Sequence, residues 1–313
     1  MKPVLDARDV SVRYHLRGRR VLQAVDGVSL SVMPGEALAL VGESGCGKST
    51  LGRCLVRLQR PSSGAIAIDG IDIARMSERA LRPYRRRMQM VFQDSQAALN
   101  PRRTVAASLA APLLAQGVSR AEAAARVAKL LELVGLPEEA GSRFPHAFSG
   151  GQRQRINIAR ALALDPALVV ADEPVAALDV SVQAQIINLF SDLRARLGLA
   201  MLFISHDLAV VRQLSDRMAV MYLGSVVEEG PTEALLRMPR HPYTAALMAA
   251  VPTRDGAAPA VLAGDVPSPL DPPSGCRFHT RCPFVRERCR SERPALVADV
   301  DGRTTACHFP IQS

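Results

Sequence analysis

The chain has 313 residues, more than a typical domain, so its length predicts one large domain with an appended region. Hydrophobic residues make up 48% of it and charged residues 22%, which is ordinary for a protein with a buried core. The formal net charge is +9, but aromatic residues make up only 4% and Trp is absent, which argues against a base-stacking surface. We therefore expect no nucleic-acid partner, and a solvated face or an acidic protein partner instead.

The sequence predicts no membrane-spanning segment of its own. It contains no run of about twenty uncharged apolar residues, the length that a spanning helix needs. The first residues carry charge at Lys2 and Asp6 and lack the apolar segment of a signal peptide. We expect the chain to stay in the cytoplasm and to reach a membrane only through a partner.

The first third of the chain is rich in predicted strands. Residues 4–14 and 21–33 are rich in Val and Leu, with polar turns between them. Residues 64–70 alternate between apolar and small or polar side chains and end in a turn residue. Residues 37–41 form a short continuous apolar run, which is typical of a strand buried on both faces.

Helical patterns follow, and then more buried strands. Residues 106–116 and 120–134 are rich in Ala and Leu at helical spacing, which predicts a helical insertion. Residues 168–171 and 200–204 are apolar runs that predict strands, and residues 180–197 between them predict a helix. A strand, a helix and a strand in this order indicate an α/β fold with a parallel sheet.

A phosphate-binding motif follows the apolar run at 37–41. Its pattern is Gly, four residues, then Gly-Lys-Ser, and a helix is predicted to begin directly after it. Backbone N–H groups of such a loop surround phosphate, Lys48 reaches the β- and γ-phosphates, and the Ser49 hydroxyl binds Mg²⁺. The candidate nucleotide-binding residues are Gly42, Glu43, Ser44, Gly45, Cys46, Gly47, Lys48, Ser49 and Thr50.

Two carboxylates end the predicted strand at 168–171. Asp172 suits a residue that holds Mg²⁺ or its water, and Glu173 suits the general base that polarises the attacking water. Adjacent acids are common on surfaces, so this pair is a weak signal alone. Together with the phosphate-binding motif it predicts ATP hydrolysis.

A third motif resembles the signature of the ABC ATPase family, with Phe148 in place of leucine. It precedes a predicted helix at 153–164 and exposes N–H groups suited to a γ-phosphate, while Ser149 is also a good helix cap. In the ABC family this motif contacts the ATP bound to the opposite subunit, so the resemblance implies a dimer that encloses two nucleotides. The candidate residues are Ser149, Gly150, Gly151 and Gln152.

Four further residues match ABC elements in the expected order. Tyr14 lies where the family places an aromatic ring against adenine, although a strand Tyr is at least as often a core residue. Gln93 matches the Q-loop, which senses the γ-phosphate and Mg²⁺ and adjoins the transmembrane subunit. Asp179 matches the D-loop, which crosses the dimer interface. His206 matches the switch histidine, which contacts the γ-phosphate and positions the water and Glu173.

The resemblance implies an ABC nucleotide-binding domain at residues 1–254, with a RecA-like core, an antiparallel β subdomain and a helical subdomain at about 95–165. Residues 255–275 are rich in Pro, Gly and Ala and predict a linker. Residues 276–313 follow as a small Cys-rich C-terminal extension.

Several stretches, among them residues 100–102, 216–224 and 241–244, look like the branch of the family that imports peptides. Residues 148–156 are similar to the second, F-type, of the two paralogous ATPases in that branch. The resemblance implies ATP-driven import of oligopeptides or dipeptides at the cytoplasmic face of the membrane. It also implies a paralogous ATPase in a heterodimer, two permeases and, indirectly, an extracytoplasmic peptide-binding protein.

Two alternatives to peptide import stay open. The same machinery could import nickel or another small solute, because the substrate site belongs to other subunits. A soluble ABC ATPase that acts on ribosomes or DNA is a different class. Such proteins usually have two cassettes or a long coiled-coil insertion, and this sequence has neither.

Cys276, Cys282, Cys289 and Cys307 gather in the C-terminal extension. Structural zinc sites usually contain two ligands that are two to four residues apart, and this set has no such pair. Wider spacing is compatible with a [4Fe–4S] cluster, which needs four sulfurs. The extension also looks like the tails of peptide-importer ATPases, to some of which such clusters are attributed. Zinc, with His279 or His308 as further ligands, and unliganded thiols are the alternatives.

Overall fold

The computed structural model describes residues 2–250, 264–299 and 301–311. Its strands are β1 Leu5–His15, β2 Val21–Val32, β3 Ala37–Val41, β4 Ser63–Ile68, β5 Ile71–Asp72, β6 Met88–Val91, β7 Leu168–Asp172, β8 Ala200–Ile204, β9 Arg217–Tyr222, β10 Ser225–Pro231, β11 Val297–Ala298 and β12 Thr304–Thr305. Its α-helices are α1 Lys48–Leu55, α2 Glu78–Arg85, α3 Ser95–Ala98, α4 Val105–Ala115, α5 Arg120–Leu133, α6 Gly150–Ala161, α7 Val180–Leu197, α8 Leu208–Leu214, α9 Thr232–Arg237, α10 Pro242–Ala249 and α11 Glu287–Ser291. Short 3₁₀ helices span Arg17–Arg19, Glu138–Ser142 and Pro145–Ala147.

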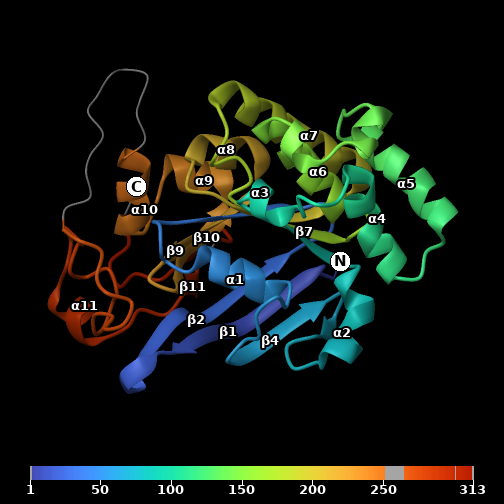
Figure 1. Ribbon diagram of the computed structural model, residues 1–313. Helices are drawn as coiled ribbons and strands as arrows, with labels where there is room; N and C mark the ends of the chain where they lie inside the picture. The colour runs from blue at the N-terminus through green and yellow to red at the C-terminus, as the bar shows by residue number, and fades with distance from the viewer. Residues whose placement is uncertain (1, 251–263, 300, 312–313) are drawn as a thin grey trace.

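The strands of the described residues form two sheets. The larger sheet has the order β11-β12-β10-β9-β3-β8-β7-β6, and β3 pairs in parallel with both β8 and β9. The smaller sheet has the order β2-β1-β4-β5 and is antiparallel. In Figure 1, α6, α7 and α8 lie on one side of the larger sheet, and the smaller sheet lies on the other side with α1 between the sheets. The sequence-based prediction of an α/β fold with a parallel sheet is therefore confirmed.

The strand β3 explains why the molecule is layered in this way. All five of its residues are buried, as the continuous apolar run predicts for a strand covered on both faces. Leu38 and Leu40 belong to the core beneath α1 and the smaller sheet, whereas Ala39 and Val41 contact a second cluster around Tyr222. Side chains of one strand alternate between faces, so β3 contributes to two cores at once.

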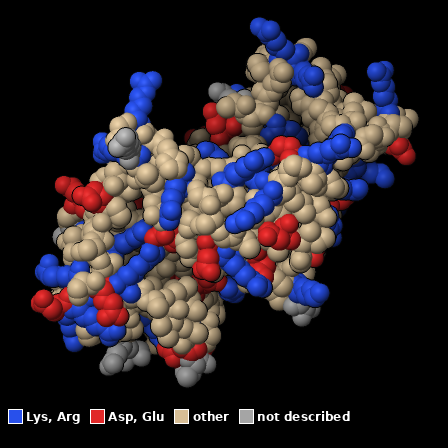
Figure 2. Space-filling model, turned by 90° about the horizontal axis from the view of Figure 1, so that it is seen from below, with Lys and Arg blue, Asp and Glu red and all other residues tan. Residues whose placement is uncertain are grey.

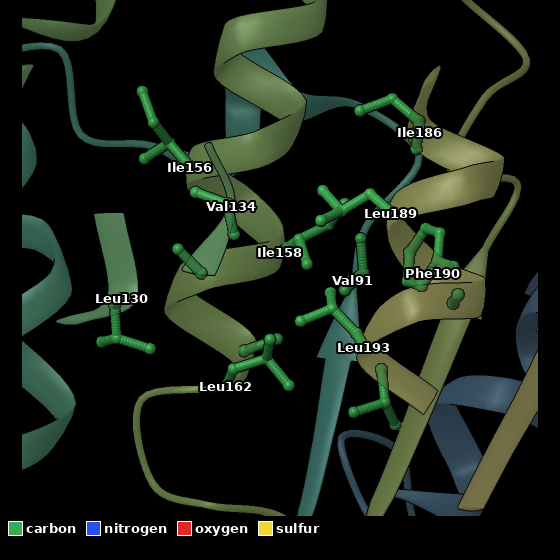
Figure 3. Close-up of a cluster of buried hydrophobic side chains, with 14 of the residues drawn as sticks. Val91, Leu130, Val134, Ile156, Ile158, Leu162, Ile186, Leu189, Phe190 and Leu193 are labelled. Carbon is green, nitrogen blue, oxygen red and sulfur yellow. The ribbon is translucent and has the colours of Figure 1, made fainter. Parts of the chain in front are cut away.

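Helices α4, α5, α6 and α7 share a third core with β6 and β7. Figure 3 shows Ile156 and Ile158 of α6, and Leu162 at its C-cap, between Leu130 of α5 and the side chains of α7. On α7, Phe190 lies with its ring edge toward Phe203 of β8, with ring centroids 5.8 Å apart. This packing attaches the helical segment to the larger sheet.

Helix α6 begins earlier than the sequence predicts. The predicted range is 153–164, and the structure gives Gly150–Ala161. Ser149 is the N-cap, and its Oγ accepts a hydrogen bond from the Gln152 backbone at 3.3 Å. Gln152 Oε1 in turn accepts from the Ser149 N–H at 3.1 Å, which completes a capping box. The signature glycines therefore lie inside the first turn. Glycine is unfavourable in a helix, and the stabilisation from the capping box offsets this cost at the start of α6.

The C-terminal extension packs against the larger sheet. Strand β12 pairs with β10 through Glu228 and Thr305, so the extension adds strands to the sheet. Part of the predicted linker, residues 255–263, lies outside the described residues. The described remainder, residues 264–275, contains no helix or strand.

Basic side chains are distributed among acidic ones on the face seen in Figure 2. The ion pairs of the described residues include Arg87 with Asp69 at 2.8 Å and Arg85 with Glu78 at 2.7 Å. These pairs reduce the local positive charge of the surface. Separately, no helix in the described ranges is long and apolar enough to cross a membrane.

Candidate nucleotide-binding site

The phosphate-binding motif forms the turn between β3 and α1. Gly47 is the N-cap of α1 with φ of +105°, and Gly42 has φ of +153°. A Cβ at Gly47 would clash with the carbonyl oxygen of Ala24, and one at Gly42 would clash with that of Met221. Only glycine satisfies both the positive φ and the close approach of neighbouring backbone.

Lys48 holds this loop in shape. Its side chain is buried, and its Nζ donates hydrogen bonds to the carbonyl oxygens of Gly42 at 2.7 Å and Glu43 at 2.9 Å. An ammonium group at the centre of the loop and the N-terminus of α1 both favour an anion. The first turn of α1 has no capping hydrogen bond from any described side chain. The loop therefore fits a phosphate chain.

Ser49 and Asp172 place two oxygen atoms beside the loop. Ser49 Oγ donates to Asp172 Oδ1 at 2.7 Å across the gap between α1 and the end of β7. Burial raises the pKa of Asp172, and the hydrogen bond from Ser49 opposes that shift. Hydroxyl and carboxylate oxygens are the ligands that Mg²⁺ prefers, so this pair fits a magnesium ion that also contacts phosphate.

Glu173 lies between two other predicted residues, Gln93 and His206. Gln93 Nε2 donates to its Oε2 at 3.0 Å, and His206 Nδ1 lies 3.4 Å from its Oε1. Its backbone has φ of +43°, which is uncommon for a non-glycine residue, and its N–H donates to the Ile204 carbonyl at 3.0 Å. Strained residues of this kind cluster at functional sites. The Glu173 carboxylate faces Gln93 and His206, while that of Asp172 bonds Ser49.

A cavity of about 310 Å³ lies beside the phosphate loop, and of the predicted nucleotide-site residues Gly42, Glu43, Asp172 and His206 do not line it. Tyr14 lies on its rim, 36% exposed, with its hydroxyl bonded to Gln59 at 2.7 Å. The predicted residues that line the cavity are Tyr14, Ser44, Gly45, Cys46, Gly47, Lys48, Ser49, Thr50, Gln93 and Glu173. Sequence reasoning missed the remaining lining residues, which are Leu22, Gln23, Ala24, Leu223, Gly224 and Pro269.

The signature and the D-loop residue Asp179 lie together at the starts of α6 and α7. Gly151 packs against Val182 of α7, and Gly150 approaches Leu178. Asp179 is the N-cap residue of α7 and therefore adjoins the same contact. Within the part of the chain that the structure describes, Ser149–Gln152 and Asp179 do not line the cavity of the phosphate loop.

The four cysteines of the extension line one small cavity together with His279 and His308. The Cys276 N–H donates to the Cys289 carbonyl at 2.9 Å, which ties two of the cysteine segments together. Burial is the largest of the effects that raise the pKa of Cys307 to about 11. Across the described ranges, no group of three or more His, Cys, Asp or Glu is placed to hold a metal ion. The thiols are therefore gathered, but not in a coordinating arrangement.

Replacing Gly47 by Ala tests the loop geometry. The positive φ alone costs about 1–3 kcal/mol for a side-chain-bearing residue, and the new Cβ meets the Ala24 carbonyl. ATP affinity, measured by calorimetry on the full chain, should fall by at least about 10-fold. Gly70→Ala is the matched control, because Gly70 also has positive φ of +82° but a Cβ there would have no described neighbour within 4 Å. Equal ATP affinities of the two variants would contradict the assignment.

The comparisons with known proteins agree with this geometry. Residues 25–176 match the ABC transporter family, and residues 227–289 match the oligopeptide/dipeptide transporter C-terminal region. A probable peptide ABC transporter ATP-binding protein of Sinorhizobium fredii is 54% identical over 92% of this chain and 83% of its own length. A putative peptide import ATP-binding protein of Brucella abortus is 55% identical over 93% of this chain and 88% of its own.

A solved structure shares the fold. It is a dimeric ATP-binding cassette in a post-hydrolysis state bound to ADP and Pi, with a TM-score of 0.67 and 30% identity. The likeness covers 73% of this chain and 98% of that one. On the family match, the similar relatives and the shared cassette fold, the chain belongs to the ABC transporter family as one of its ATP-binding cassettes.

Proposed function

We propose that the chain is the ATP-hydrolysing subunit that powers import of oligopeptides or dipeptides across the cytoplasmic membrane. The observation that carries the ATPase proposal is the position of Glu173, which is bonded to Gln93 and adjoins His206 at the edge of the phosphate-loop cavity. The peptide proposal is supported by the C-terminal region match and by the names of the relatives.

In the proposed reaction, backbone N–H groups of residues 44–50 bind the phosphate chain, and Lys48 adds positive charge. Ser49, Asp172 and Gln93 would hold Mg²⁺, which when bound neutralises charge on the phosphate oxygens. Glu173 accepts a proton from the attacking water as general base. His206 contacts the γ-phosphate and keeps the Glu173 carboxylate oriented. Tyr14 contributes its ring to the adenine side of the cavity.

A second ATP-binding chain completes each site in this proposal. The signature Ser149–Gln152 begins a helix whose first turn suits a γ-phosphate, yet it adjoins Asp179 rather than the chain's own loop. We propose that it contacts ATP held by the partner and that Asp179 lies at the interface. Family likeness favours a paralogous ATPase as this partner, and hence a heterodimer.

We propose that ATP-driven movement of this chain reaches the permeases through a surface beside Gln93. A cavity of about 430 Å³ lies between β6 and the helical segment, lined by Phe92, Arg103, Ala111 and Arg160 among others. Its position next to Gln93 suits a segment of a transmembrane subunit that follows ATP-dependent movement. We propose two permeases as partners, a location at the cytoplasmic face, and an extracytoplasmic peptide-binding protein acting through them. Nickel or another small solute is the alternative cargo.

For the extension, we propose that Cys276, Cys282, Cys289 and Cys307 hold a [4Fe–4S] cluster, with zinc as the alternative. The proposal is supported by the gathering of the four thiols around one cavity, although 5, 6 and 17 residues separate consecutive cysteines in the sequence. Coordination needs deprotonated sulfur and a shift of the side chains into ligand geometry, and metal binding itself supplies the free energy for such changes.

We also propose residues 1–254 as the ATPase unit and 276–313 as its appended region, joined by 255–275.

Replacing Glu173 by Gln tests the proposed base. Because Gln cannot accept the proton, ATP turnover of the assembled transporter should fall by about 10²–10⁴-fold. ATP binding should persist, since Lys48 and Ser49 are unchanged. Glu233→Gln is the matched control, because Glu233 is an exposed carboxylate paired with Arg212 on α8. Undiminished turnover in Glu173→Gln would remove Glu173 from the role of base.

Anaerobic purification of the full chain tests the cluster. Iron and acid-labile sulfide should each approach about four per chain, with a visible charge-transfer absorption that Cys289→Ser abolishes. Cys54→Ser is the control, because Cys54 is a buried residue of α1 in a core that contains no residue of the extension. Stoichiometric zinc would favour the alternative. If the purified chain contained neither iron nor zinc, the cysteines would be unliganded thiols.

A further inference from the structure

Arg281 of the C-terminal extension reaches the phosphate-binding loop. Its Nη1 lies 2.7 Å from Glu43 Oε2 and its Nη2 lies 2.9 Å from Glu43 Oε1, which is a bidentate pair. The Arg281 side chain is 4% exposed and that of Glu43 is 21% exposed. The two residues are 238 positions apart in sequence, so the pair joins the last segment of the chain to its first motif.

Glu43 is held at its other polar atoms as well. Its N–H donates to the Tyr243 hydroxyl at 2.8 Å, and its carbonyl accepts from Lys48 Nζ at 2.9 Å. Tyr243 belongs to α10, at the end of the ATPase segment. The conformation of the loop at its second residue thus depends on groups outside the loop. Among the described ion pairs, Arg281 is the cation that contacts the Glu43 carboxylate.

The aromatic cluster of Tyr222, Tyr243 and Phe278 fixes the position of Arg281. Phe278 lies three residues before Arg281 and packs with ring centroids 5.3 Å from Tyr222 and 5.4 Å from Tyr243. Arg281 Nη1 also lies 3.5 Å from the Tyr222 hydroxyl. A buried guanidinium braced in this way presents its fork to Glu43 with little loss of side-chain entropy.

The negative charge of Glu43 lies in the loop that is proposed to bind the phosphates of ATP. A carboxylate in a loop that receives phosphate repels the ligand unless a cation neutralises it. Burial strengthens both the repulsion and its compensation. We propose that Arg281 is a positioning residue for the phosphate-binding loop, which neutralises Glu43 and fixes the loop so that ATP affinity depends on the C-terminal extension. The proposal rests on the assignment of residues 42–50 as the ATP-binding loop.

A double-mutant cycle on the full chain tests this, with ATP affinity measured by calorimetry. Arg281→Gln leaves the Glu43 carboxylate uncompensated, so the Kd for ATP should rise by about 10-fold or more. Glu43→Gln removes the repelling charge, and the double variant should bind ATP within about three-fold of Glu43→Gln alone. A purely structural loss would not be rescued in this way. In the assembled transporter, Arg281→Gln should raise KM for ATP and change kcat by less than about two-fold.

Two control variants separate the possible outcomes. Arg303→Gln removes another buried arginine of the extension, 5% exposed, which bonds Asp301 and the Met238 carbonyl away from the loop, so its Kd should match wild type. Lys48→Ala tests the loop assignment itself and should abolish binding. Wild-type affinity in Arg281→Gln with loss of binding in Lys48→Ala would overturn this proposal alone.

Other results would overturn it on different grounds. If Arg303→Gln weakened ATP binding as much as Arg281→Gln, general docking of the extension would explain the effect. A double variant as weak as Arg281→Gln would exclude charge compensation. Wild-type binding by Lys48→Ala would remove the loop assignment and this proposal together. Thermal unfolding of each variant shows whether the fold is retained.

Discussion

The parallel pairing of β3, β8 and β7 is the constraint on which the candidate ATP site depends. Leu40 pairs with Ile204, and Ile204 pairs with Asp172, so the three strands reach their carboxyl ends side by side. The phosphate loop, the segment of His206 and Glu173 each follow one of these ends. Ligands of open α/β sheets bind at this edge because the residues that follow neighbouring strands meet there. The site is therefore a consequence of strand register as much as of motif sequence.

The candidate ATP site and the signature lie in different parts of the described chain. The loop and the acidic pair lie at the strand ends, whereas the signature begins α6 beside α7. Capping by Ser149 and Gln152 stabilises the start of α6 and leaves further N–H groups of its first turn available for an anion. In the proposed dimer, a nucleotide enclosed between two chains would link hydrolysis to movement at their interface, which is what a transporter motor needs.

Much of this architecture is predictable from the sequence, for physical reasons. The apolar run at β3, the glycines of the loop and the carboxylates after β7 are local patterns, and each has a single structural interpretation once their order is considered. Contacts set by tertiary register are not predictable in this way. The lining residue Leu22 comes from β2, which carries no motif, and Gly224 ends a stretch whose family likeness does not place it at the nucleotide site. The ion pair of Glu43 with Arg281 joins positions whose proximity depends on how the extension packs.

The most direct test of the transport function is affinity purification of the full-length Glu173→Gln chain from native membranes with ATP, followed by mass spectrometry. If the chain powers an importer, two permeases and a second ATPase are recovered, and Lys48→Ala, which should not bind ATP, yields less of the paired ATPase. Recovery of ribosomal proteins or DNA-repair factors in place of permeases would contradict the transport function and leave the ATPase assignment standing.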